Sequence, residues 1–198
     1  MIAIIDSGGA NIASVQFALE RRGAKGVLTA DAQVINAADK VILPGVGAAD
    51  VAMRQLREQG LIDCIRALKQ PVLGVCLGMQ LLFEHSDEED TELLGVVPGK
   101  VAEFPVGRGL TVPHMGWNRL LPIDKTNSHP LLHNVAPGSH VYFVHSYFAP
   151  LSGDTIAGCD YGLGFTAMVA SGNFMGCQFH PEKSGPVGAQ ILNNFLSL

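Results

Sequence analysis

The chain has 198 residues, of which 47% are hydrophobic and 16% are charged, and this composition predicts one globular domain, residues 1–198, with a sizeable core. Its formal net charge is −5 and its 13 Lys and Arg residues form no basic cluster, which argues against binding nucleic acid through bulk electrostatics. The most apolar stretch, residues 71–83, is interrupted by Gly74 and Gly78 and is shorter than the roughly 20 residues of a membrane helix.

Short apolar and amphipathic segments alternate in the first half of the chain, a pattern that predicts a parallel β-sheet covered by helices. The apolar opening, residues 1–5, is too short for a signal peptide, so we expect a cytoplasmic protein. The predicted strands are residues 1–5, 26–29, 40–43 and 71–75. The predicted helices are residues 11–22, ending at Gly23, and residues 48–68, with a break at Gly60.

Beyond about Gly95 the pattern changes to short β-like segments separated by glycine and proline, which predicts a mixed or antiparallel extension. These segments are residues 96–97, 101–104, 141–144, 155–158, 166–170 and 174–179. Apolar residues at helical spacing then predict a closing helix over residues 185–198.

Cys76 stands apart from the other three cysteines, Cys64, Cys159 and Cys177. The four are widely spaced, without a C-x-x-C pair or flanking histidines, so they predict neither a disulfide framework nor a metal site. Cys76, however, lies between Gly74 and Gly78 where a strand meets a helical run over residues 77–84, which is typical of a nucleophile elbow. The backbone N–H of Leu77 could then donate to an oxyanion.

A base for this thiol is predicted at His180. It follows the β-like residues 174–179, and Glu182, two residues later, can accept a hydrogen bond from the other imidazole nitrogen. The P-G-V-G segment at residues 44–47 ends another strand, so an N–H of Val46 or Gly47 could supply a second oxyanion donor.

Three segments together resemble the class I, or triad-type, glutamine amidotransferases: G-V-C-L-G-M-Q at 74–80, P-G-V-G at 44–47 and Q-F-H-P-E at 178–182. P-H-M-G-W-N at 113–118, Y-F-V-H-S-Y at 142–147 and residues 6–15 narrow the resemblance to the glutaminase subunits of imidazole glycerol phosphate synthases. It covers essentially the whole chain. The departure is residues 7–10, S-G-G-A, where the family commonly has an aromatic residue after the aspartate.

The resemblance implies an α/β fold, a flavodoxin-like three-layer sandwich with a central, mostly parallel sheet and an additional antiparallel or mixed sheet. It implies a glutaminase that hydrolyses L-glutamine through a thioester and needs no cofactor or metal. The implied partner is a cyclase subunit with a (β/α)8-barrel fold, which forms a heterodimer with this chain and uses the ammonia in histidine biosynthesis. In the family, glutaminase activity stays low until the cyclase site is occupied.

Residue roles follow from matching motif positions. The implied catalytic residues are Cys76, His180 and Glu182, and the implied oxyanion donors are Val46, Gly47 and Leu77. The implied substrate-binding residues are Gln80, Glu88, His145, Ser146 and Tyr147, with Glu88 pairing with the substrate ammonium. The implied partner contacts are Asn11, Trp117, Tyr142 and Lys183.

Other interpretations remain open at this point. A glutaminase serving anthranilate or pyridoxal phosphate synthesis would carry the same triad, although the P-H-M-G-W-N segment argues against both. A cysteine peptidase or γ-glutamyl hydrolase could use the same fold. A non-catalytic stabilising subunit would not need the intact Cys76, His180 and Glu182.

Overall fold

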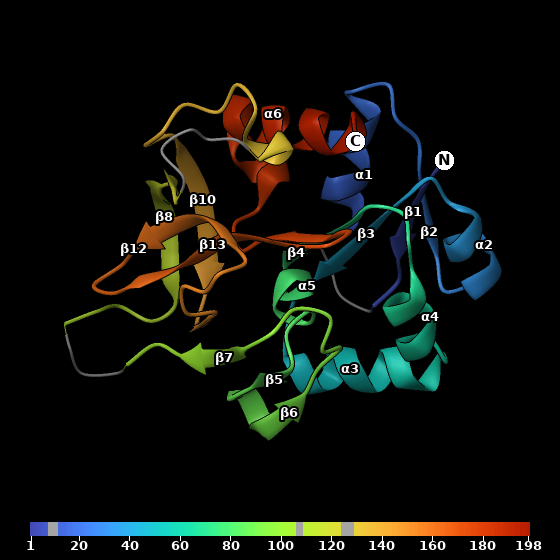
Figure 1. Ribbon diagram of the computed structural model, residues 1–198, viewed down its shortest axis with the longest axis horizontal. Coiled ribbons are helices and arrows are strands. Elements are labelled where there is room, and N and C mark those ends of the chain that lie inside the picture. Colours follow the sequence, from blue (N-terminus) through green and yellow to red (C-terminus); the bar gives the residue numbers. More distant parts are fainter. Residues whose placement is uncertain (8–11, 106–108, 124–128) are drawn as a thin grey trace.

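The computed structural model describes residues 1–7, 12–105, 109–123 and 129–198. Its elements form three layers around a central sheet (Figure 1). One face of the sheet is covered by α1 (Ile12–Glu20) and α6 (Gly185–Leu196). The opposite face is covered by α2 (Ala32–Ala37), α3 (Ala49–Glu58) and α4 (Ile62–Ala67).

The central sheet has eight strands, and five neighbouring strands in it are parallel. These five are, in spatial order, β2 (Gly26–Thr29), β1 (Ile2–Ile5), β3 (Lys40–Gly45), β4 (Val72–Cys76) and β14 (Phe174–Cys177). Three antiparallel strands extend the sheet beyond β14: β13 (Gly164–Ser171), β12 (Thr155–Asp160) and β9 (Leu121–Pro122). The predicted fold class is confirmed.

Two smaller sheets complete the fold and supply the additional antiparallel and mixed structure that was predicted. In one, β10 (His140–His145) pairs antiparallel with β8 (His114–Arg119). The other is mixed and contains β11 (Tyr147–Phe148), β7 (Lys100–Glu103), β5 (His85–Ser86) and β6 (Thr91–Glu92).

The central sheet is apolar on both faces, as the uniformly apolar strands predicted. Along β1, Ile2 and Ile4 pack into the core beneath α1 and α6, whereas Ala3 and Ile5 pack into the core beneath α2, α3 and α4. Side chains alternate between the two faces of a strand, so a strand buried on both faces cannot show an apolar and polar alternation. No helix of the described residues is long and apolar enough to cross a membrane.

Several local predictions differ from the structure. Residues 96–97 form a bend and no strand, and the helical run expected over residues 77–84 is the short helix α5 (Leu77–Gln80) followed by turns. Helix α2 was not predicted, although Asp31 caps it by accepting a hydrogen bond from the N–H of Gln33. The strands β5, β6, β8, β9 and β11 were not predicted either. Four of them have only two residues, and Gly116 interrupts the β-like pattern of β8.

The place of β14 is the difference that matters for the site. The sequence pattern put residues 174–179 in a mixed or antiparallel extension without a named neighbour, whereas β14 lies beside β4 in the central sheet and runs parallel to it, with Cys177 opposite Val75. Parallel neighbours end at the same edge of a sheet, so the chain that leaves β14 emerges next to the end of β4. Residues that follow Cys76 and residues that follow Cys177 therefore meet.

Candidate active site

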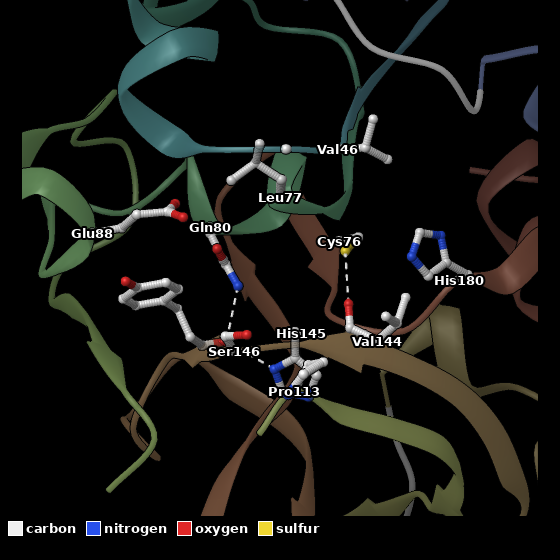
Figure 2. Close-up of a pocket in the computed structure, with 12 residues that line it drawn as sticks. Val46, Cys76, Leu77, Gln80, Glu88, Pro113, Val144, His145, Ser146 and His180 are labelled. Atoms are coloured by element: carbon white, nitrogen blue, oxygen red, sulfur yellow. Dashed lines mark hydrogen bonds between the residues drawn. The ribbon is translucent and has the colours of Figure 1, made fainter. Parts of the chain in front are cut away.

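Cys76 occupies a sharp turn between β4 and α5. Its backbone has φ 55° and ψ −115°, a region that residues with a side chain rarely adopt and that costs conformational energy. Helix α5 begins at the next residue, so the strand, the cysteine and the helix follow one another without a loop. This is the geometry of a nucleophile elbow, and it turns the Cys76 side chain into a pocket at the edge of the sheet (Figure 2).

The glycines on either side of Cys76 are required by close backbone contacts. A Cβ atom on Gly74 would lie 2.5 Å from the carbonyl oxygen of Gly78, and a Cβ on Gly78 would overlap the carbonyl oxygen of Leu43 in β3. Helix α5 thus packs directly against the backbones of β3 and β4. The glycines make this packing possible, and the packing holds the strained Cys76 in place.

His180 and Glu182 lie beside Cys76, after the end of β14. The Nδ1 atom of His180 is 2.8 Å from Oε1 of Glu182, and the two side chains are only 5% and 1% exposed. A carboxylate accepts hydrogen bonds, so Nδ1 carries the proton in this pair and Nε2 remains for Cys76. Figure 2 shows the His180 ring next to the Cys76 sulfur.

The charge state of His180 is set by these two neighbours. Burial alone lowers the pKa of His180, but hydrogen bonds with Cys76 and Glu182 and the negative charges of both raise it to about 10. His180 is therefore protonated at neutral pH when Cys76 is a thiolate. In this ion pair the thiolate is ready to act as the nucleophile and the imidazolium as the acid.

The other three thiols have no such surroundings. Burial raises the pKa of Cys177 well above the ordinary thiol value and raises that of Cys159 to about 12. Burial also raises the pKa of Cys64, against a hydrogen bond from Asn36 that lowers it. These thiols stay protonated near neutral pH and are not part of the lining of the pocket that Cys76 and His180 share, which leaves Cys76 as the candidate nucleophile.

Ser184, which no sequence motif had indicated, holds the turn after His180 against the neighbouring strand. The turn is the short helix η3 (Pro181–Lys183). The Ser184 hydroxyl donates to the carbonyl of His180 at 2.7 Å and accepts from the N–H of Tyr142 in β10 at 2.9 Å. The N–H of His180 donates to the Tyr142 carbonyl at 2.9 Å. Ser184 is 1% exposed, so its hydroxyl is part of the interior framework.

The pocket in front of Cys76 has a volume of about 360 Å³, within the usual range for sites that hold a small molecule. Ten of the eleven residues predicted for catalysis, oxyanion stabilisation or substrate binding line it, and the eleventh, Glu182, lies behind His180. The ten are Val46, Gly47, Cys76, Leu77, Gln80, Glu88, His145, Ser146, Tyr147 and His180. Pro113 and Val144, which were not predicted, also contribute to the lining.

The predicted oxyanion donors lie where the strands β3 and β4 end. Gly45 is opposite Cys76 in the pairing of these strands, so Val46 and Gly47 continue next to the cysteine. Leu77 is the first residue of α5, and the first N–H groups of a helix have no acceptor within that helix. The hydroxyl of Ser7, one of the residues that depart from the family pattern, donates to the Pro44 carbonyl at 2.7 Å, so Ser7 supports the start of this turn.

Glu88 faces the pocket and also caps a helix. One carboxylate oxygen, Oε2, accepts from the N–H of Ala49, the first residue of α3, at 2.8 Å. Burial raises the pKa of Glu88, and the hydrogen bond from Ala49 opposes that rise. The Glu88 carboxyl group thus lines the pocket and ties the loop after Gly47 to the pocket wall.

Gln80 and Gln178 form a buried bridge beside the nucleophile. Nε2 of Gln80 donates to the Tyr147 carbonyl at 3.0 Å and to Oε1 of Gln178 at 2.9 Å. Nε2 of Gln178 is 3.9 Å from the Cys76 sulfur and donates towards it. Gln178 belongs to the Q-F-H-P-E segment, but no role of its own was predicted for it.

The predicted partner contacts are partly brought together. Trp117 and Tyr142 are opposite one another in β8 and β10, with ring centroids 6.0 Å apart, and Trp117 is 56% exposed. Lys183 is exposed in η3, whose flanking residues are hydrogen-bonded to Tyr142. Asn11 is outside the described residues. Within the described ranges, no group of three or more His, Cys, Asp and Glu side chains is arranged to hold a metal ion.

Comparison with known proteins agrees with this geometry. Residues 3–198 match the family described as glutamine amidotransferase class-I. The imidazole glycerol phosphate synthase subunit HisH of Xanthomonas euvesicatoria pv. vesicatoria is 51% identical over 197 residues, covering 100% of this chain and 97% of that protein. The protein of the same name from Xylella fastidiosa, strain Temecula1, has the same identity and coverage.

Two solved structures are similar in fold. A crystal structure of a glutamine amidotransferase has a TM-score of 0.74 and 18% sequence identity, covering 99% of this chain and 97% of that one. The structure of PurLQS from Thermotoga maritima has a TM-score of 0.72 and 16% identity, again covering 99% and 97%. At these identities the likeness concerns the fold alone.

Proposed function

We propose, because this chain belongs to the class-I glutamine amidotransferases, that Cys76 hydrolyses glutamine and that the ammonia released serves a synthase partner. The chain has the glutaminase function of the imidazole glycerol phosphate synthase subunits HisH, which are 51% identical to it over its whole length, and acts in histidine biosynthesis. The observation that most directly supports Cys76 as the nucleophile is its position, on an elbow, next to the buried pair of His180 and Glu182.

The reaction begins with attack of the Cys76 thiolate on the side-chain amide carbon of glutamine. The carbonyl oxygen becomes an oxyanion, which the N–H groups of Leu77 and of the turn at Val46 and Gly47 stabilise. His180 gives its proton to the departing nitrogen, the C–N bond breaks, and ammonia leaves a glutamyl thioester on Cys76.

Water completes the cycle. Neutral His180 now accepts a proton from water as the oxygen attacks the thioester carbon, and the C–S bond breaks to release glutamate and restore the thiolate beside the imidazolium. Glu182 keeps Nδ1 protonated and the ring oriented, and it stabilises the positive charge of His180 in both halves of the reaction.

Glu88 gives the pocket selectivity for an amino acid. Its carboxylate lies in the pocket wall on the opposite side from His180 (Figure 2), where it can pair with the substrate α-ammonium. Ser146 and Tyr147 supply main-chain groups along the same wall, and Gln80 braces that segment through the Tyr147 carbonyl. A free glutamine is thus held with its side chain directed to Cys76.

The partner is a cyclase subunit with a (β/α)8-barrel fold, with which this chain forms a heterodimer. Its contacts lie on the strands β8 and β10, through Trp117 and Tyr142, and on η3, through Lys183. Tyr142 is hydrogen-bonded through its main chain to His180 and Ser184, so the partner would bind directly beside the catalytic turn. This arrangement suits an enzyme whose ammonia is used only inside a complex.

The test compares two nitrogen sources in the reconstituted complex. Cys76→Ala with the cyclase partner should lose product formation from glutamine and keep it with ammonium chloride. Cys64→Ala is the matched control, because Cys64 lies outside the pocket, and it should keep both activities. Product from glutamine in the Cys76→Ala complex would remove Cys76 from the mechanism. Loss with both nitrogen sources would instead favour a stabilising subunit.

A further inference from the structure

Three hydrogen-bonded polar side chains run from β8 to the pocket wall, and none of them takes part in the reaction steps. Asn118 and His114 lie on β8, and His145 lies directly opposite His114 on β10. Nδ2 of Asn118 is 3.3 Å from Nε2 of His114, and Nδ1 of His114 is 2.9 Å from Nε2 of His145. Nδ1 of His145 is 2.8 Å from the carbonyl oxygen of Tyr147.

These contacts allow only one direction of donation when both histidines are neutral. The Tyr147 carbonyl can only accept, so Nδ1 of His145 carries the proton and Nε2 of His145 accepts. Nδ1 of His114 must then carry the proton that Nε2 of His145 accepts, which leaves Nε2 of His114 as an acceptor for the amide of Asn118. The second hydrogen of that amide donates to the Asp160 carbonyl at 2.9 Å. Every donor in the chain has an acceptor.

The surroundings keep both rings neutral. His114 is stacked between Tyr161 and Phe143, at centroid distances of 4.0 and 5.0 Å, and Phe104 meets the His145 ring at 5.2 Å. His114 and His145 are 3% and 6% exposed. Burial lowers the pKa of His114 to about 4. Burial, and the repulsion that the protonated forms of His114 and His180 would add, lower that of His145 to about 3, against the hydrogen bond with Tyr147.

The Tyr147 carbonyl, where these hydrogen bonds end, is also connected to Cys76. The Tyr147 carbonyl accepts from His145 and from Gln80. Gln80 also donates to Gln178, whose amide donates towards the Cys76 sulfur. Hydrogen bonds therefore link β8 to Cys76 without a gap, and their direction reverses at the Tyr147 carbonyl, which accepts from both ends.

We propose that His114 and Asn118 are positioning residues for glutamine: the hydrogen bond that His114 donates holds the His145 ring, and that ring holds the Tyr147 main chain that forms one wall of the glutamine pocket. This inference rests on the proposed glutaminase activity. Two residues that alternate with them along β8, Met115 and Trp117, are 66% and 56% exposed on the outer face. A partner bound to that outer face would keep β8 in place, and with it the pocket wall that His114 and Asn118 hold.

Two substitutions of His114 separate the donated hydrogen bond from mere packing. His114→Leu removes the donor and leaves Nε2 of His145 buried without its hydrogen bond, so KM for glutamine should rise by about tenfold while kcat changes by less than about threefold. In His114→Asn the amide nitrogen can take the place of Nδ1, so KM should return to within about threefold of the wild type. Tyr161→Phe, which keeps the ring stacked on His114, is the control and should leave KM unchanged.

The kinetic outcomes bear on the inference separately from the proposed function. All variants are measured in the complex with the cyclase partner, with Cys76→Ala as the inactive reference. A purely structural role would lower the fraction of folded enzyme, and hence kcat, without raising KM. A wild-type KM in His114→Leu, or an equal loss in His114→Asn and His114→Leu, would overturn the positioning role while leaving the glutaminase assignment intact.

The tautomers give a measurement that does not depend on folding of a variant. In the wild-type complex with ¹⁵N-labelled histidine, NMR should show His114 and His145 each protonated at Nδ1 and not at Nε2 near neutral pH. In Asn118→Asp a carboxylate replaces the amide donor, so His114 should gain a proton at Nε2. Protonation of either ring at Nε2 in the wild type would contradict the direction of the chain and overturn the inference.

Discussion

Replacing Gly78 with alanine would place a methyl group where the backbone of β3 already lies. The new Cβ would overlap the Leu43 carbonyl oxygen and lie 2.8 Å from the carbonyl carbon, whereas ordinary van der Waals contact begins at 3.4 Å. Strand β3 and helix α5 would have to separate by more than half an ångström, and neither side is a flexible side chain that can turn away. We therefore expect a cost at the upper end of overpacking effects, about 3 kcal/mol or more.

The same displacement moves the nucleophile. Cys76 directly precedes α5, and misplacement of a reacting group by about 1 Å can cost about 100-fold in rate. Gly78→Ala should thus lower kcat/KM for glutamine by about that factor in whatever fraction of the protein folds. Urea unfolding measures the stability, and glutamate production in the complex with the cyclase partner measures the rate.

Gly153→Ala is the matched control. A Cβ atom at Gly153 would have no other atom within 4 Å, so stability and activity should stay close to those of the wild type, within about 0.5 kcal/mol. Gly74→Ala, whose Cβ would lie 2.5 Å from the Gly78 carbonyl oxygen, should be damaging as well. Wild-type stability and activity in Gly78→Ala would refute the close strand and helix packing described for the elbow.

Three further predictions concern charge. Glu182→Gln removes a charge that raises the pKa of His180, so kcat/KM should fall by about 100-fold or more. The alkaline limb of the pH profile of kcat/KM, where His180 loses its proton, should move to lower pH, and an unmoved limb would contradict this role. Glu88→Gln and Glu88→Ala should both raise KM for glutamine. Only Glu88→Ala loses the hydrogen bond that caps the Ala49 N–H, so in a urea titration its free energy of unfolding should be lower by about 1 kcal/mol. Equal stability of the two variants would exclude the cap. His114 stays neutral in the folded protein down to about pH 4, whereas in the unfolded chain it takes up a proton near pH 6.5, so stability should fall as pH falls from about 6.5 to about 4. His114→Asn should reduce this dependence of stability on pH. An identical dependence in the wild type and the variant would refute the lowered pKa of His114.

Much of the fold could be predicted because the first half of the chain carries local signals. The strands β1, β2, β3 and β4 are short apolar segments, and Gly60, at φ 70°, separates α3 from α4 as the sequence indicated. The pairing of β14 could not be predicted in this way. Its apolar residues suit a parallel or an antiparallel neighbour equally well, and its partner β4 is about a hundred residues earlier in the chain.

Some residues of the candidate site could be predicted from the sequence, and others could not. Cys76 and His180 could be found because their neighbours carry the signal: two glycines for the elbow, and a glutamate two residues after the histidine. Ser184 and Gln178 could not, since a serine or a glutamine has many uses. Their partners, Tyr142 and Cys76, are 42 and 102 residues away along the chain.

The sequence by itself determined the chemistry of this protein: which thiol stands on an elbow, which histidine has an acid beside it, and which family the motifs resemble. Those features are local, because they depend on residues within a few positions of one another. Only the tertiary structure decided how the groups act together. The parallel pairing of β14 with β4 brings His180 to Cys76, and the pairing of β10 with β8 joins His145 to His114. Hydrogen bonds form only over about 3 Å, so strand register, which the sequence specifies only through the whole core, determines which of these side chains meet.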